Sequence, residues 1–248
     1  MSDFDPASVA IRPAATVMLI RETDTAGVEV FMMRRTTKAA FAGGMYVFPG
    51  GAVDAEDSSY EVAAIRECFE EAGVLLARAA SGSIVRLHDP AVQERFATYR
   101  HDVHSGRRSL TSVLEAENLD PMVDQMHWVA HWVTPYGEVR RFDTRFFVTA
   151  MPPDQEPLHD DLETVDSLWV TPADALGRAR RGELLMLPPT MVNLGFLADH
   201  ESVDSIMGSV ASIGTPARIL PKVRWAADGR INALLMPGDP GYEDLPDH

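Results

Sequence analysis

Residues 58–73 read SSYEVAAIRECFEEAG, and this stretch predicts a helix from Tyr60 to Ala72. Ser58 and Glu61 have the S-x-x-E spacing of a capping box, and Gly73 is the residue type that commonly ends a helix. Between these ends, apolar residues recur at helical spacing along one face, which we expect to pack against a core. That face consists of Val62, Ile65, Phe69 and Ala72.

The opposite face of this helix carries three carboxylates, Glu67, Glu70 and Glu71. Glu67 and Glu71 are a like-charge i,i+4 pair, which costs about 0.2–0.5 kcal/mol. The helix dipole disfavours negative charge in the last turn by about 0.3–1 kcal/mol per group. Such local conflicts often mark functional sites, and a bound cation would reverse both penalties. Ligands made only of oxygen favour Mg²⁺ or Mn²⁺. The alternative is a solvated acidic face partly paired with Arg66.

Composition and charge limit the possible classes of protein. The chain has 248 residues, 46% of them hydrophobic, which suits one domain with a packed core. We interpret residues 14–240 as that domain, between tails at 1–13 and 241–248. The sequence has no transmembrane stretch and no apolar signal core, and its single cysteine favours a cytoplasmic protein. The net charge of −15 opposes binding to nucleic acid. An anionic substrate would need cations or local arginines.

Strand and helix patterns alternate irregularly along the rest of the chain, which favours an α+β, α/β/α sandwich over a doubly wound sheet. Residues 89–126 show helical spacing and are interpreted as a helical insert. Further helices are predicted to start near Pro172 and to span Pro188–His200. Strands are predicted at Thr16–Glu22, Val28–Arg34, His127–Val133, Phe142–Ala150 and Glu163–Val170, and a late hairpin at Arg218–Trp225 and Ile231–Met236, with its turn at Asp228-Gly229.

Residues 66–74, RECFEEAGV, resemble the second half of the Nudix box, which reads R-E-U-x-E-E-x-G-U with U apolar. Cys68 takes one of the apolar positions, and Pro49-Gly50-Gly51 stands where that family has a glycine loop. The sequence departs from the family at one point. One extra residue separates Gly51 from Arg66, and Ser58 occupies the place of the first glutamate of the box. Glu56 or Asp57 could serve in its place.

The resemblance extends over roughly residues 14–240 to the Nudix subfamily of the peroxisomal coenzyme A diphosphatase of animals. That subfamily also carries a helical insert after its box, so a Nudix-type sandwich with a mixed sheet and one insert is implied. The peroxisomal tail signal is not found here. The matching segments are Val47–Gly51, Phe69–Leu76, Trp132–Pro135, Arg140–Thr144, and Trp169 with Pro172.

The resemblance implies roles for particular residues. Glu67, Glu70 and Glu71 would hold Mg²⁺ or Mn²⁺, and Glu70, Glu71 or Glu163 would orient or deprotonate the attacking water. Arg66 would support the glutamates, and Gly50 and Gly51 would let the loop pass close to them. Four arginines could bind substrate phosphates, although each taken alone is more readily explained as an ordinary surface charge. These are Arg34, Arg35, Arg140 and Arg141.

The function implied is metal-dependent hydrolysis of a diphosphate bond in a nucleotide conjugate. Coenzyme A or acyl-coenzyme A would give 3′,5′-ADP and 4′-phosphopantetheine or its acyl form. Two alternatives stay open: a Nudix hydrolase for ADP-ribose or dinucleotides, and a non-catalytic nucleotide sensor of the same fold. The partner would be a small nucleotide diphosphate, not nucleic acid or a membrane, and family analogy allows a homodimer.

Overall fold

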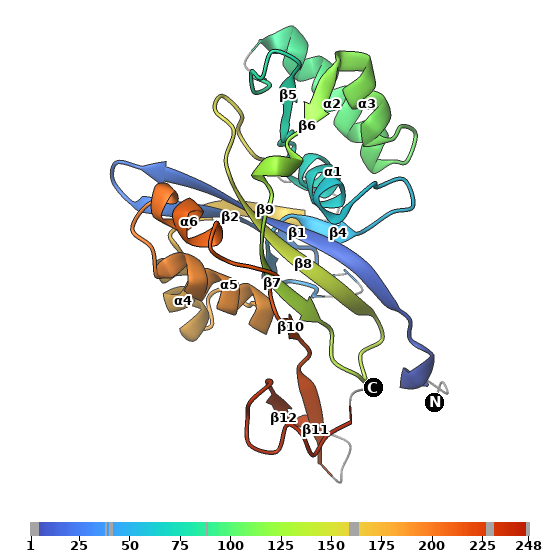
Figure 1. The fold of residues 1–248 in the computed structure, drawn as a ribbon, viewed down its shortest axis with the longest axis vertical. Coiled ribbons are helices and arrows are strands. Elements are labelled where there is room, and N and C mark those ends of the chain that lie inside the picture. The colour runs from blue at the N-terminus through green and yellow to red at the C-terminus, as the bar shows by residue number, and fades with distance from the viewer. Residues whose placement is uncertain are drawn as a thin grey trace.

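A mixed sheet of eight strands forms the centre of the molecule (Figure 1). The computed structural model describes residues 5–37, 39, 42–87, 89–158, 164–226 and 231–246. The sheet order is β10-β7-β8-β1-β2-β3, with β4 paired to β1 and β9 to β2. The β1–β8 and β10–β7 pairs are parallel, and the other pairs are antiparallel. The strands are β1 (Ile11–Thr23), β2 (Gly27–Arg35), β3 (Tyr46–Val47), β4 (Gly50–Ala52), β7 (His127–Val133), β8 (Arg141–Ala150), β9 (Thr164–Val170) and β10 (Arg218–Ile219).

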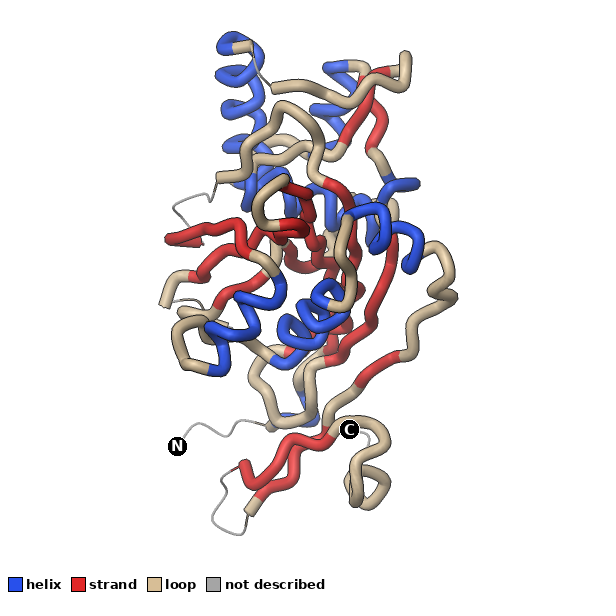
Figure 2. Tube along the Cα trace, turned by 90° about the vertical axis from the view of Figure 1, so that its left-hand side faces the viewer, coloured by secondary structure: helices blue, strands red, loops and turns tan. Residues whose placement is uncertain are grey.

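Helices cover both faces of this sheet (Figures 1 and 2). One face packs against α1 (Tyr60–Ala72), and the other against α4 (Pro172–Arg180), α5 (Pro188–Ala198) and α6 (Val203–Val210). Side chains of a strand alternate between the two faces, so β1 contributes to both cores. Val17 and Leu19 pack on the α1 side, and Met18 and Ile20 pack on the α4–α6 side. The predicted α/β/α sandwich with a mixed sheet is confirmed.

The insert forms a lobe beyond α1, at the top of Figure 1. It contains α2 (Pro90–His104), α3 (Leu110–Glu117) and β6 (Leu119–Pro121), and it also includes β5 (Ala77–Ala79), which precedes the predicted start at residue 89 and pairs with β6. Phe96, Val103, Leu110 and Val113 are buried in the core that α1 also enters. The insert is helical as predicted, and its apolar side chains pack in this core. The β5–β6 pair was not predicted, because each strand has only three residues.

The C-terminal hairpin projects from the end of the molecule opposite the insert (Figure 2). It pairs β11 (Lys222–Trp225) with β12 (Ile231–Leu235), and its predicted turn at 228–229 lies outside the described residues. The strand predicted at Arg218–Trp225 is divided at Leu220-Pro221 into β10 and β11. Proline cannot donate a ladder hydrogen bond, which explains the break.

Helix α1 has the predicted bounds, but its cap is Ser59 rather than Ser58. The Ser59 backbone is extended, and its hydroxyl accepts a hydrogen bond from the Val62 amide. Gly73 ends the helix with φ of 70°. Strand β1 begins at Ile11, within the segment interpreted as a tail, because it pairs with β8 from there. Short helices η1 (Pro6–Ser8) and η2 (Val123–Gln125) complete the elements. Across the described ranges, no helix is long and apolar enough to span a membrane.

Candidate active site

The three predicted carboxylates lie on the ridge of α1 that faces β4. The side chains of Glu67, Glu70 and Glu71 are 14%, 13% and 4% exposed. A solvated acidic face would leave such side chains largely open to water. Instead they are mostly buried and enclosed by polar groups, which favours a functional cluster over the solvated-face alternative.

Arg66 is the centre of this cluster. Its Nη1 donates to Glu67 Oε1 at 2.9 Å and to Glu70 Oε1 at 3.0 Å. Its Nη2 donates to Asp57 Oδ2 at 2.9 Å and to the Ala52 carbonyl at 2.8 Å. The planar guanidinium therefore joins the helix, the β4 strand and the loop between them. This geometry agrees with a supporting role for Arg66.

The one-residue insertion in the loop brings Asp57, and not Glu56, to the helix. The Asp57 side chain is 4% exposed, bonds to Arg66 and accepts from the Asp54 amide at 2.8 Å. Glu56 is exposed. An acidic residue near the first glutamate position of the box thus contacts the cluster through Arg66.

Gly50 and Gly51 are required by close approach. The Gly50 amide donates to Glu71 Oε2 at 2.9 Å, and a Cβ at Gly50 would lie 2.5 Å from the carbonyl oxygen of Ala15 on β1. A Cβ at Gly51 would lie 2.5 Å from Oε1 of Glu67. Either side chain would displace a carboxylate or strand β1, so the glycine loop presses directly on the cluster.

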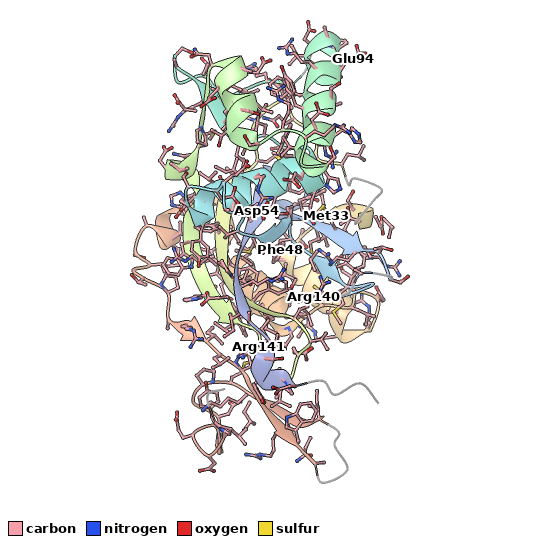
Figure 3. All side chains as sticks on the ribbon, turned by 90° about the vertical axis from the view of Figure 1, so that its right-hand side faces the viewer. Met33, Phe48, Asp54, Glu94, Arg140 and Arg141 are labelled. Atoms are coloured by element: carbon pink, nitrogen blue, oxygen red, sulfur yellow. The ribbon has the colours of Figure 1, made fainter. Side chains whose placement is uncertain are left out.

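Only one of the four predicted phosphate-binding arginines reaches the cluster. Arg35 Nη1 lies 3.7 Å from Glu71 Oε1. Arg34 is exposed, as expected for the preceding residue on a strand, whose side chain points to the other face. Arg140 is exposed, and buried Arg141 donates Nε to the Thr134 carbonyl. Arg141 pairs with Ile11 on β1, whereas Gly51 pairs with Ala15 of that strand, about 13 Å further along. Figure 3 shows Arg141 far from Asp54, which lies beside α1.

Three positively charged or basic residues at α1 were not predicted. Arg100 and His104 lie on α2 and approach the C-terminal end of α1. Arg145 of β8 lies at the other end, with its Cζ 3.8 Å from the ring centre of Tyr60 and 4.4 Å from that of Trp128. No local pattern marks these residues, because each approaches α1 through the tertiary fold. Glu163 and its neighbours Asp160 and Asp161 lie outside the described residues.

The electrostatics of the cluster favour a cation. Burial raises the pKa of the Glu70 carboxyl, and the hydrogen bond from Arg66 offsets only part of that rise. Asp57, Glu67 and Glu70 all share the one guanidinium of Arg66, so negative charge is in excess there. Their oxygens are the hard donors that Mg²⁺ and Mn²⁺ prefer, and the donor set fits such an ion. In the described part of the chain, no three His, Cys, Asp or Glu side chains are arranged to hold a metal. Among these residues, Arg66 instead donates to Oε1 of Glu67 and Oε1 of Glu70, and the Gly50 amide donates to Oε2 of Glu71.

Cys68 lies between the glutamates in sequence but faces the core. It is fully buried, and burial raises the pKa of its thiol. A protonated, enclosed thiol is neither a nucleophile nor a metal ligand. Its packing among apolar residues agrees with the apolar position that it was assigned in the motif.

The sandwich fold and an R-E-x-x-E-E helix beneath a glycine loop define the chain as a Nudix hydrolase-type protein. The family model described as the NUDT19 Nudix domain matches residues 56–197, more than half of the chain. The chain therefore belongs to the NUDT19 Nudix family.

Similar proteins agree with this assignment. The human acyl-coenzyme A diphosphatase NUDT19 is 31% identical over 201 residues, which cover 75% of this chain and 52% of that protein. The chain thus matches only about half of the human protein. The Gallus gallus acyl-coenzyme A diphosphatase NUDT19 is 26% identical, over 89% of this chain and 74% of that protein. The crystal structure of a NUDIX hydrolase from Alicyclobacillus acidocaldarius superposes with a TM-score of 0.72 at 28% identity, over 85% of this chain and all of that one.

Proposed function

We propose that this protein hydrolyses the diphosphate bond of coenzyme A or acyl-coenzyme A in the presence of Mg²⁺ or Mn²⁺. The products would be 3′,5′-ADP and 4′-phosphopantetheine or its acyl form. The observation that carries the proposal is the mostly buried cluster of Glu67, Glu70 and Glu71, the first two bonded to Arg66, on a helix with the family motif. A sensor that only binds nucleotide would have no need to bury mutually repelling carboxylates.

The roles proposed for the residues follow from their chemistry. Glu67, Glu70 and Glu71 would hold the divalent cation, which would neutralise charge on the diphosphate. Arg66 holds the carboxylates of Glu67 and Glu70 together, and Asp57 fixes Arg66 in turn. A carboxylate that does not bind metal must orient or deprotonate the water. Glu70, Glu71 and Glu163 are the candidates for that base.

Two observations support a coenzyme A-type substrate. The human and chicken relatives are both named acyl-coenzyme A diphosphatases. Arg35 places a guanidinium beside Glu71, where it can reach a phosphate next to the proposed metal site. Because the chain carries a net charge of −15, an anionic substrate depends on such local cations. We do not assign that role to Arg34 and Arg140, which are exposed, or to Arg141, which pairs with Ile11 of β1, four residues before the partner of Gly51.

A substrate panel tests this function. Purified protein would be incubated with coenzyme A, an acyl-coenzyme A, dephospho-coenzyme A and ADP-ribose, with Mg²⁺, Mn²⁺ or EDTA, and the products identified by mass spectrometry. We expect coenzyme A to be cleaved only with a divalent cation. Dephospho-coenzyme A lacks the 3′-phosphate, so it should react about ten- to a hundredfold more slowly if Arg35 contacts that phosphate, because a charge-assisted contact contributes about 1.5–3 kcal/mol. A preference for ADP-ribose would overturn the substrate assignment, and no hydrolysis of any compound would favour a sensor.

We further propose that the protein acts in a reducing, cytoplasmic setting and, by analogy with Nudix relatives alone, that it can form a homodimer. Its single cysteine is buried in the core, so no surface thiol is available for a disulfide. Light scattering after gel filtration would measure the mass of the assembly, and a monomer at micromolar concentration would contradict the dimer.

A further inference from the structure

Arg100 of the insert donates three hydrogen bonds at the C-terminal end of α1, where Glu70 and Glu71 lie. Its Nε donates to the Glu70 carbonyl at 2.9 Å, and its Nη2 donates to the carbonyls of Glu71 at 2.7 Å and Leu158 at 2.9 Å. The guanidinium packs so closely on the end of the helix that a Cβ at Gly73 would lie 2.9 Å from Arg100 Nη1. Thirty residues separate Arg100 from Glu70 in the chain.

This contact compensates for the unpaired carbonyls and the missing positive charge at the C-terminal end of α1. The last carbonyls of a helix have no partner within the helix, and their dipole favours a cation. The last turn of α1 contains no basic residue, yet it carries Glu70 and Glu71. Arg100 supplies both the hydrogen-bond donors and the positive charge. It thereby offsets the unfavourable dipole that the sequence of α1 creates.

The same guanidinium fixes the surroundings of the helix end. Leu158, whose carbonyl accepts from Arg100, donates its own amide to the Ala72 carbonyl at 2.9 Å. His104 follows Arg100 by one turn of α2, and its Nδ1 lies 3.8 Å from Oε2 of Glu70. The backbone of Glu70 is thus bonded to α2, and its carboxylate lies beside the same helix. Rotation of the last turn of α1 would break these contacts together.

We propose that Arg100 is a positioning residue for the metal site: it fixes the last turn of α1 so that Glu70 and Glu71 present their carboxylates together with Glu67. The inference rests on the proposed function, because it requires that these glutamates bind a divalent cation. Through Arg100, the insert would support the metal site in addition to packing against α1. Residues that orient metal ligands without touching the metal typically contribute ten- to a hundredfold in metal affinity or activity.

Direct titration with Mn²⁺ tests the proposal without any substrate. Free Mn²⁺ would be measured by electron paramagnetic resonance for the wild type, Arg100→Met, Arg100→Lys and Glu70→Gln. We expect Arg100→Met to raise the Kd ten- to a hundredfold at a temperature where circular dichroism shows it folded. Arg100→Lys keeps the charge but cannot reach three carbonyls, so its Kd should lie between those of the wild type and Arg100→Met. If Arg100→Met is unfolded, Arg100→Lys decides the test.

Arg95→Met is the matched control on the same helix. Arg95 pairs with Glu117 inside the insert, with Nε 2.9 Å from Oε1, so its loss should leave the Kd within twofold of wild type. A wild-type Kd in both Arg100 variants, with binding lost in Glu70→Gln, would overturn this proposal and leave the proposed function intact. An equal rise in Arg95→Met would also overturn it, because any damage to the insert would then suffice. Absence of Mn²⁺ binding by the wild type would overturn both.

Discussion

The motif helix α1 and the insert helix α2 both hold Glu70, but they reach it through different relationships in sequence. On α1, Arg66 bonds to the Glu70 carboxylate across one turn of the same helix. On α2, Arg100 bonds to the Glu70 carbonyl from thirty residues away. The first contact follows from helical periodicity, so it can be predicted from the motif alone. The second exists only because the insert folds back onto the end of α1.

This difference separates the chemistry of the site from its support. Apart from Arg35 and the candidate base Glu163, the residues with a proposed chemical role lie on one helix and its glycine loop, where spacing alone brings them together. The residues that fix the C-terminal end of this helix come from α2 and from the segment around Leu158. Substitutions of the α1 carboxylates should therefore abolish activity, whereas substitutions of charged residues elsewhere should weaken it by smaller factors or leave it unchanged.

The largest effect is expected from Glu70→Gln, compared with Glu115→Gln on the exposed surface of α3. Glu70→Gln keeps the shape of the side chain but removes its charge, so activity on coenzyme A should fall at least a hundredfold. The free energy of unfolding should hold or rise. Burial raises the pKa of the Glu70 carboxyl in the folded protein, so the charged carboxylate lowers the free energy of unfolding at pH values above that raised pKa. This loss of stability disappears as the pH falls through the raised pKa and the carboxyl becomes protonated.

Initial rates over a range of Mg²⁺ concentrations, with urea unfolding of both variants, would measure these effects. Glu115→Gln should match the wild type in both, because Glu115 is exposed and remote from the cluster. An active Glu70→Gln enzyme with unchanged Mg²⁺ dependence would remove Glu70 from the metal site and erase the contrast between the two helices.

The next effect is expected from Arg35→Met, with Arg34→Met as its neighbour and control. Arg35 approaches Glu71, whereas Arg34 is exposed on the other side of β2. Loss of one charge-assisted contact to a substrate phosphate costs about 1.5–3 kcal/mol, so kcat/KM should fall about ten- to a hundredfold for Arg35→Met. Arg34→Met should change it less than twofold. Steady-state kinetics on coenzyme A would show this, and equal losses in the two variants would mean that neither binds substrate.

Adjacent Arg34 and Arg35 also show where the sequence stops being sufficient. The apolar periodicity of α1 and its terminal glycine predicted the bounds of that helix, and apolar runs predicted β1, β2, β7 and β8. Which arginine of the pair faces α1 depends on the phase of β2, and β2 is apolar on both faces before Arg34, so no pattern fixes that phase. The bulge between Arg34 and Arg35 against β9 adds a further irregularity.

Long-range contacts and short elements were the other part that the sequence could not predict. Arg100 sits on a helix of low amphipathicity, among several other charged residues, and nothing local distinguishes it from Arg95. Helix α6, with eight residues including Gly208, is too short for periodicity to identify. The capping serine was misplaced by one residue because Ser58 and Ser59 are adjacent and only the backbone angles decide between them.

A smaller effect is expected where the box contains its extra residue. Asp57→Asn keeps the shape of the side chain but weakens its bonds to Arg66, which should lower the free energy of unfolding by about 1.5 kcal/mol. Glu56→Gln should change it by less than about 0.5 kcal/mol, because Glu56 is an exposed surface residue. Urea unfolding of both variants measures the difference. Equal stability would show that Arg66 is held sufficiently by Glu67, Glu70 and the Ala52 carbonyl, and that the loop carboxylate is dispensable.

The smallest effect is expected at Cys68, which separates the two faces of α1 within a single turn. Its neighbour Glu67 belongs to the cluster, whereas Cys68 is fully buried on the core side. Cys68→Ala should therefore change kcat/KM on coenzyme A less than twofold, although the small cavity should cost about 1 kcal/mol of stability. A thiol reagent should label the native protein only as fast as it unfolds, and denatured protein at once. Rapid labelling of the native enzyme with loss of activity would place Cys68 at the site, and the division of α1 into a chemical face and a packing face would then fail.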